Sequence, residues 1–275
     1  MGWQKEYVTT TDGLRLHVRI YTPDKFDRGT ILFIHGGGDH GGRYLHVAER
    51  LGQRGWRSIL PDHRGHGESP GERWDIDRCD TYFADLDRVL DASQQPKEQT
   101  VLLGHSFGGL LTARWAELSP SPRAAVLTSP LLGLALKVPL WKRWLGRFLL
   151  LVAPKTRFRS GLDPKNMMHD PERLAQRRAD PFLQKELTAR WFFAMQDGIA
   201  AARRDAAAVV CPLLVLQGAD DRTVEPDASR EWINRTSSVD RAFHEFPGHV
   251  HELLNEADWA ETTDLIADWL DRHVV

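Results

Sequence analysis

The sequence contains little cysteine and no long uninterrupted hydrophobic run. Its two cysteines, Cys79 and Cys211, lie far apart and form no C-x-x-C pair, so we expect them to be reduced, as in a reducing compartment. No apolar stretch approaches the length of a transmembrane helix, and the N-terminal residues lack the apolar core of a signal peptide. A net charge of −2 over 275 residues gives no argument for nucleic-acid binding. These absences predict a cytoplasmic protein without a nucleic-acid partner.

The stretch Val101–Leu111 is the most informative part of the chain. Within it, Gly104-His105-Ser106-Phe107-Gly108 matches the pattern G-x-S-x-G, with a strand-like apolar run before it and a helix-like pattern after it. A serine on such a sharp turn is lifted above the sheet, and the Phe107 N–H points at the carbonyl under attack. The five-residue pattern also occurs in glycine–serine loops without chemistry, so its meaning depends on the rest of the chain.

Short apolar runs alternate with amphipathic helical patterns over most of the chain. This alternation predicts a mostly parallel sheet with helices on both faces, preceded by a hairpin that turns at Thr11-Asp12-Gly13. Functional loops of such a sheet lie at the carboxyl ends of its strands, where we expect His35, Asp62 and Ser106. The expected strands are 6–10, 14–21, 30–34, 56–60, 100–103, 124–128, 213–217 and 242–246, and the expected core helices are 43–54, 80–93, 227–234 and 259–270.

A glycine-rich loop, His35-Gly36-Gly37-Gly38, directly follows the first buried strand. Glycines let a backbone approach a ligand closely, so beside a nucleophilic serine the Gly37 N–H is our candidate for a second oxyanion donor. An ordinary glycine turn is the alternative. The loop lacks the G-x-G-x-x-G spacing of dinucleotide sites. His63 and His66 have no carboxylate or thiol at ligand spacing, so we expect neither a metal nor a cofactor.

The alternation breaks between residues 130 and 208, which we expect to form a helical cap without strands, inserted into a core of residues 1–129 and 209–275. Leu131–Asp205 contains 15 basic and 7 acidic residues, a net charge of +8. Inside it, residues 140–149 place apolar groups on one face and Lys142, Arg143 and Arg147 on the other. Such a helix packs on the protein body or on a second copy in a homodimer, or it contacts an anionic membrane surface.

Two carboxylates and two histidines near the C-terminus compete to complete the site. Asp220 and Asp221 follow strand 213–217, and His249 and His251 follow strand 242–246. A carboxylate in the first loop can hold a histidine in the second, and that histidine can activate a serine. Considered alone, the residues leave both choices open.

Taken together, the chain resembles serine hydrolases of the α/β-hydrolase fold. Within that fold it resembles the monoacylglycerol lipase and lysophospholipase branch of the serine-aminopeptidase-like family. The order nucleophile, acid, base is that of this fold, and the resemblance extends from the first hairpin to the last helix, including a helical cap. The matching motifs are His35-Gly36-Gly37-Gly38 with Arg43-Tyr44, Asp62-His63-Arg64-Gly65-His66-Gly67-Glu68-Ser69, Gly104-His105-Ser106-Phe107-Gly108, Gly218-Ala219-Asp220-Asp221-Arg222 and His251-Glu252-Leu253-Leu254-Asn255-Glu256.

The resemblance implies a mostly parallel α/β-hydrolase sheet with an inserted cap, and a Ser106, His251 and Asp221 triad that hydrolyses carboxylic esters through an acyl-enzyme. Asp221 is favoured over Asp220 because the family acid directly precedes the arginine. His251 is favoured over His249 because it begins the His-Glu-Leu-Leu-Asn-Glu segment, which leaves His249 to line the site or shape its loop.

The resemblance has one departure, at Asp39, where family members usually carry glutamate before the histidine. The apolar cap suits the acyl chain of a monoacylglycerol-type lipid, since each buried methylene contributes about 0.8 kcal/mol. Alternative activities on the same triad are those of a lysophospholipase, a short-chain esterase, a peptidase, a thioesterase or an acyltransferase, and a non-catalytic receptor is the alternative of another class. The residues expected around the acyl chain are Leu131, Leu132, Leu134, Leu136, Trp141, Trp144, Trp191, Phe192 and Phe193, with His249 nearby.

Overall fold

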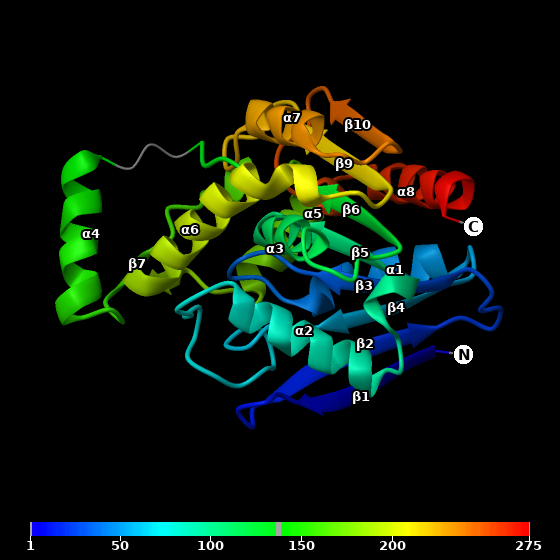
Figure 1. Ribbon diagram of the computed structural model, residues 1–275, viewed down its shortest axis with the longest axis horizontal. Helices are drawn as coiled ribbons and strands as arrows, with labels where there is room; N and C mark the ends of the chain where they lie inside the picture. The colour runs from blue at the N-terminus through cyan, green and yellow to red at the C-terminus, as the bar shows by residue number, and fades with distance from the viewer. Residues whose placement is uncertain (1, 136–138, 275) are drawn as a thin grey trace.

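The fold is organised around one eight-stranded sheet, seen in the computed structural model, which describes residues 2–135 and 139–274 (Figure 1). The strands lie in the order β1-β2-β4-β3-β5-β6-β9-β10. The first two form the predicted antiparallel hairpin, β2 also runs antiparallel to β4, and all the remaining pairs are parallel. The strands are β1 (Gly2–Thr9), β2 (Arg15–Thr22), β3 (Gly29–Ile34), β4 (Trp56–Pro61), β5 (Thr100–His105), β6 (Ala124–Thr128), β9 (Leu213–Gly218) and β10 (Arg241–Phe246).

Helices cover both faces of this sheet. Side chains alternate between faces along a strand, so in β3 Ile31 and Phe33 pack into one apolar cluster and Leu32 and Ile34 into the other. Because the central strands are buried on both sides, their sequences read as continuous apolar runs. The core helices are α1 (Leu45–Gly52) and α8 (Trp259–His273) on one face, and α2 (Asp80–Ala92), α3 (Phe107–Ala116) and α7 (Pro226–Arg235) on the other.

The segment that joins β6 to β9 contains the helices α4 (Leu140–Val152), α5 (Pro171–Ala179) and α6 (Ala189–Asp205). Figure 1 shows α6 running diagonally along the left side of the core toward α7, with α4 standing apart at the left margin. We refer to residues 130–208 as the cap, whose exact bounds stay a prediction. Among the described residues, no helix is both long and apolar enough to cross a bilayer.

The expectation of a cap without strands is wrong. β7 (Arg157–Arg159) and β8 (Glu186–Thr188) pair antiparallel as a small ribbon in which Phe158 faces Leu187 across the strands. Two strands of three residues each are too short to show a twofold hydrophobic period, and their pairing spans a helix and two loops. Tertiary contacts therefore create this ribbon without a local sequence signal.

Candidate active site

The turn between β5 and α3 holds Ser106 in a strained backbone conformation. Its φ of 54° lies in the left-handed region that residues other than glycine rarely adopt. The two glycines of the motif permit the turn: a Cβ on Gly108 would lie 1.8 Å from the Ile34 carbonyl oxygen, and one on Gly104 would lie 2.2 Å from Thr112 Oγ1. The sequence thus forms a sharp elbow that presents Ser106 Oγ at the carboxyl edge of the sheet.

A chain of hydrogen bonds runs from Ser106 through two buried residues of later loops. Ser106 Oγ lies 2.8 Å from His251 Nε2, and His251 Nδ1 lies 2.7 Å from Asp221 Oδ2. The other oxygen, Asp221 Oδ1, accepts the backbone N–H groups of Thr223 and Val224 at 2.8 and 3.0 Å. Burial opposes the charge on Asp221, but His251 and these amides outweigh it and lower the pKa of the carboxyl.

The neighbours that competed for these positions are bonded elsewhere. Asp220 is exposed, and its backbone N–H donates to the His249 carbonyl at 3.0 Å. His249 Nε2 lies 2.9 Å from Asp258 Oδ2. Partial burial opposes protonation of His249, but Asp258 outweighs it and raises the pKa of the imidazole. His249 is absent from the cavity lining described below, so its alternative role of shaping the loop is the one its contacts support.

The two residues predicted to supply oxyanion donors both line the cavity at Ser106. Phe107 contributes the first N–H of α3, which has no partner within its own helix. Gly37 lines the same cavity as Ser106 and Phe107. The Gly37 loop approaches so closely that a Cβ on Gly36 would touch Ser106 Cβ at 3.4 Å. This arrangement puts both predicted oxyanion donors next to the serine.

Buried histidines shape the loop that carries Gly37. His35 Nε2 accepts the His63 N–H at 2.9 Å, so the ring proton is on Nδ1, which donates to the Gly36 carbonyl at 2.8 Å. Burial lowers the pKa of His35 and so keeps this ring neutral. Within the described residues, no three His, Cys, Asp or Glu side chains form a group able to hold a metal ion.

The departure at Asp39 is accommodated by three donors. Its carboxylate accepts from Tyr44 Oη at 2.7 Å, from the His40 N–H at 2.8 Å and from Arg43 Nη1 at 3.2 Å. Burial opposes the negative charge, but Arg43 in particular outweighs it and lowers the pKa of Asp39. The shorter carboxylate therefore still anchors the loop to the 3₁₀ turn Gly41–Tyr44.

A cavity of about 640 Å³ opens at Ser106 beneath the cap, within the size range of ligand pockets. Its walls come mainly from α4, α6 and the segment 156–162, and most of the lining side chains are apolar. Polar groups gather on one wall, at residues 156–160. The apolar lining residues include Trp74, Leu131, Leu134, Trp141, Leu145, Leu149, Phe158, Leu162, Leu187, Trp191, Phe192, Phe193 and Met195.

The predicted cap residues divide into three groups. Trp191 and its neighbours in α6 line the cavity, as do Leu131, Leu134 and Trp141. Leu132 is instead fully buried in the core behind the cavity, and Trp144 is 69% exposed on the outside of α4, so both expectations are corrected. Leu136 lies outside the described residues. The apolar side chains of α4 form one broad stripe, of which Trp141, Leu145 and Leu149 lie on the edge that lines the cavity, while Trp144 and Phe148 lie on the exposed edge.

Two parts of the cavity wall carry no signal in the sequence, Trp74 and the segment 156–162. Trp74 lies in the loop between β4 and α2, and its ring packs edge-on against Trp191 at 5.4 Å between centroids. Nothing in its local sequence indicated this position. The segment 156–162 shows no strand signal in the sequence, which therefore predicts no role for its side chains.

Comparisons with known proteins identify the family of this chain. The family model described as "Serine aminopeptidase, S33" matches residues 26–258. The chain belongs to this family. Its similarity to known proteins spans nearly the whole chain: the monoacylglycerol lipase of Mycolicibacterium smegmatis is 30% identical over 95% of each protein. The phospholipase YtpA of Bacillus subtilis is 28% identical over 91% of this chain and 98% of its own.

Among solved structures, the monoacylglycerol lipase of Paleococcus ferrophilus superposes with a TM-score of 0.86 at 28% identity, covering 94% of this chain and 99% of that one. These comparisons confirm the predicted family and the predicted α/β-hydrolase fold of this S33 member.

Proposed function

We propose that this protein is a serine ester hydrolase whose substrates are single-chain lipid esters of the monoacylglycerol type. The observation that carries the proposal is the hydrogen-bonded chain Ser106–His251–Asp221 at the base of a large apolar cavity. Each methylene group of an acyl chain that is buried against such apolar walls makes binding more favourable. The monoacylglycerol lipases of M. smegmatis and P. ferrophilus, to which the chain is similar, support the same substrate class.

In the proposed reaction, Ser106 Oγ attacks the ester carbonyl while its proton passes to His251 Nε2. Asp221 holds the ring with its other proton on Nδ1 and stabilises the imidazolium. The N–H groups of Gly37 and Phe107 bind the oxyanion, and losing one such donor costs on the order of 3 kcal/mol. The carbon–oxygen bond to the alcohol then breaks, and His251 protonates the departing alcohol. Water repeats the sequence, releases the fatty acid and restores the serine.

The test is hydrolysis of monoacylglycerols of increasing chain length, beside p-nitrophenyl butyrate and a lysophospholipid of matched chain. We expect a preference for monoacylglycerol with an optimum chain length set by the cavity, and loss of all these activities in Ser106→Ala. Activity on the short nitrophenyl ester alone would refute the lipid substrate but keep the triad. A folded Ser106→Ala that retains its rate would refute the mechanism.

A lysophospholipase is the second candidate. The polar wall at residues 156–160 carries Arg157 and Arg159, and the similar phospholipase YtpA of B. subtilis points to a phosphorylated head group. Arg157 Nη2 already donates to Glu72 Oε1 at 2.8 Å, however, and this pairing would compete with a phosphate group for the guanidinium. A higher kcat/KM for the lysophospholipid than for the matched monoacylglycerol would favour this second candidate.

The proposal includes contact between α4 and a lipid surface. The helix leaves part of its apolar stripe uncovered by the protein body, since Trp144, Phe148 and Leu151 are 69%, 58% and 85% exposed. The same helix lines the cavity through Trp141, Leu145 and Leu149, so a lipid surface at α4 adjoins the path to Ser106. We expect Phe148→Ser with Leu151→Ser to weaken sedimentation with anionic vesicles and to leave p-nitrophenyl butyrate hydrolysis unchanged. Concentration-dependent dimers that these changes abolish, without vesicle binding by the unaltered protein, would identify a homodimer contact instead.

A further inference from the structure

The loop that carries His251 is held from the cap as well as from the core. The residue after the histidine, Glu252, donates its backbone N–H to the Met167 carbonyl at 2.7 Å and accepts from Arg177 Nη1 at 2.7 Å. Further along the loop, Glu256 Oε2 accepts the His169 N–H at 2.9 Å. Met167, His169 and Arg177 all belong to one stretch of the cap around α5. This stretch is therefore hydrogen-bonded to the loop at two positions, Glu252 and Glu256, and Glu252 directly follows His251.

At the contact next to His251, the two negative charges of the buried carboxylates are matched by two positive charges only when Arg177 is included. Arg43 bridges two carboxylates, lying 3.2 Å from Asp39 Oδ1 and 2.5 Å from Glu252 Oε2. These side chains are nearly buried, with 9% of Arg43, 6% of Asp39 and 4% of Glu252 exposed. Arg177, 15% exposed, supplies the second positive charge. Burial opposes ionisation of Glu252, but Arg43 and then Arg177 outweigh it and lower its pKa.

We propose that Arg177 is a positioning residue for catalysis. Through Glu252 it holds the backbone of the His251 loop so that His251 Nε2 stays in hydrogen-bond contact with Ser106 Oγ. Without Arg177, one guanidinium would have to serve two buried carboxylates, and Glu252 would turn toward solvent and carry its neighbour with it. Helix α5, which contributes no residue to the cavity lining, then acts on catalysis through the loop that carries His251. The inference rests on the proposed role of His251 but not on the proposed lipid substrate.

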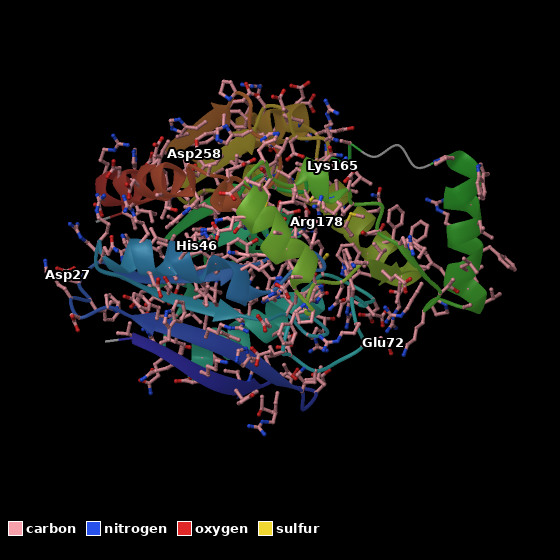
Figure 2. All side chains as sticks on the ribbon, turned by 180° about the vertical axis from the view of Figure 1, so that it is seen from behind. Asp27, His46, Glu72, Lys165, Arg178 and Asp258 are labelled. Atoms are coloured by element: carbon pink, nitrogen blue, oxygen red, sulfur yellow. The ribbon has the colours of Figure 1, made fainter. Side chains whose placement is uncertain are left out.

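The helix that presents Arg177 is well suited to a local test. Asp170 caps its N-terminus by accepting the N–H groups of Glu172 and Arg173 at 2.9 and 3.0 Å, and Pro171 occupies the first turn. Arg177 lies in the last turn, so its replacement leaves these starting signals intact. The adjacent Arg178 is exposed and has no ion pair with any residue that the structure describes. Figure 2 labels Arg178 on α5. Arg178→Gln is a control of equal charge change on the same helix.

The first experiment compares Arg177→Gln with Arg178→Gln on p-nitrophenyl butyrate, a substrate too short to depend on the acyl cavity. We expect kcat of Arg177→Gln to fall on the order of tenfold with KM within about twofold of the parent, because a small displacement of the base slows the chemical step. Arg178→Gln should match the parent in both constants. Arg177→Lys keeps the positive charge at this position but lacks the planar guanidinium group, and it should retain most of the parent kcat.

A second readout uses a fluorophosphonate probe, which reports on the reactivity of Ser106 and not on recognition of an acyl chain. Ser106 Oγ forms a bond to phosphorus, the phosphorus–fluorine bond breaks, fluoride leaves, and the serine proton passes to His251. The rate of this labelling should fall in Arg177→Gln by the same factor as kcat. A lower kcat/KM for p-nitrophenyl butyrate that comes from a higher KM, together with a normal labelling rate, would place Arg177 in substrate binding and would overturn the proposal.

A double-mutant cycle with Glu252→Gln shows whether Arg177 acts through Glu252. If it does, adding Arg177→Gln to Glu252→Gln lowers kcat no further. Additive losses, or equal rates for Arg177→Gln and Arg178→Gln, would overturn the proposal. The thermal midpoint of each variant separates misfolding from displacement. If the glutamine variant does not fold, the cycle is run with Arg177→Lys, whose smaller loss of kcat must likewise vanish in the Glu252→Gln background. A parent protein that cleaves p-nitrophenyl butyrate but no monoacylglycerol would refute the proposed lipid substrate and leave this inference standing.

Discussion

Replacing Asp221 by asparagine should invert the hydrogen-bond pattern of His251 while preserving the shape of the side chain. In the protein, Asp221 Oδ1 accepts two backbone N–H groups, and Oδ2 faces His251 Nδ1 at 2.7 Å. An asparagine must keep its carbonyl oxygen toward the two backbone donors, because its NH₂ group cannot accept from them. The NH₂ group then faces His251 and donates to Nδ1.

This reversal moves the ring proton of His251 to the wrong nitrogen. With Nδ1 acting as acceptor, the neutral imidazole carries its proton on Nε2, which lies 2.8 Å from Ser106 Oγ and can no longer accept the serine proton. Loss of the correct tautomer costs about 10⁴-fold in kcat in a serine protease with the same arrangement, or about 5.5 kcal/mol. We expect a loss of that order in Asp221→Asn.

The assay is p-nitrophenyl butyrate hydrolysis near pH 7.5, with circular dichroism and the thermal midpoint as checks on folding. Asp220→Asn is the matched control, since Asp220 is exposed and adjacent, and it should retain full activity. A folded Asp221→Asn protein that keeps more than about a tenth of the parent kcat would refute the tautomer argument. A larger loss in Asp220→Asn than in Asp221→Asn would show that the acid is the other carboxylate.

Three further predictions follow from other parts of the structure. Gly108→Ala should destabilise the fold by at least about 3 kcal/mol in urea unfolding, because its Cβ would overlap the Ile34 carbonyl; Gly13→Ala, where nothing lies within 4 Å, should cost only about 1 kcal/mol through its positive φ. Burial lowers the pKa of His46 and His105 to about 4 and of His66 to about 3, so the unfolded chain binds protons at a higher pH than the native one. Stability should therefore be complete above pH 6.5 and fall as the pH drops toward 4, by up to about 1.4 kcal/mol per pH unit for each histidine; a urea midpoint that stays flat over this range would contradict the burial argument. Leu149→Trp should fill part of the cavity and shorten the optimum chain length, lowering kcat/KM for the longest monoacylglycerol by about tenfold while sparing p-nitrophenyl butyrate, and an unchanged chain-length profile would show that the acyl chain lies elsewhere.

The parts of this protein that local sequence decides are those in which each residue depends on its neighbours along the chain. The β5 run, the glycines on either side of Ser106 and the following helix together specify the elbow, because the required backbone angles and the lack of space for a Cβ concern residues only a few positions apart. The order of strands and helices follows from hydrophobic period for the same reason. Family resemblance then selected Asp221 and His251 from two pairs that local pattern left undecided.

Tertiary structure alone decided what faces the substrate space and what supports the site from a distance. Leu132 and Trp144 have the same apolar character as the lining residues Leu131 and Trp141, and only the packing of the cap on the core separates the two groups. The β7–β8 ribbon, Trp74 in the cavity wall and the contact of Arg177 with Glu252 join residues that are tens of positions apart. Composition and periodicity describe a residue's tendency to be buried, whereas its partner is set by how distant segments meet in three dimensions, and that information appears only when the chain has folded.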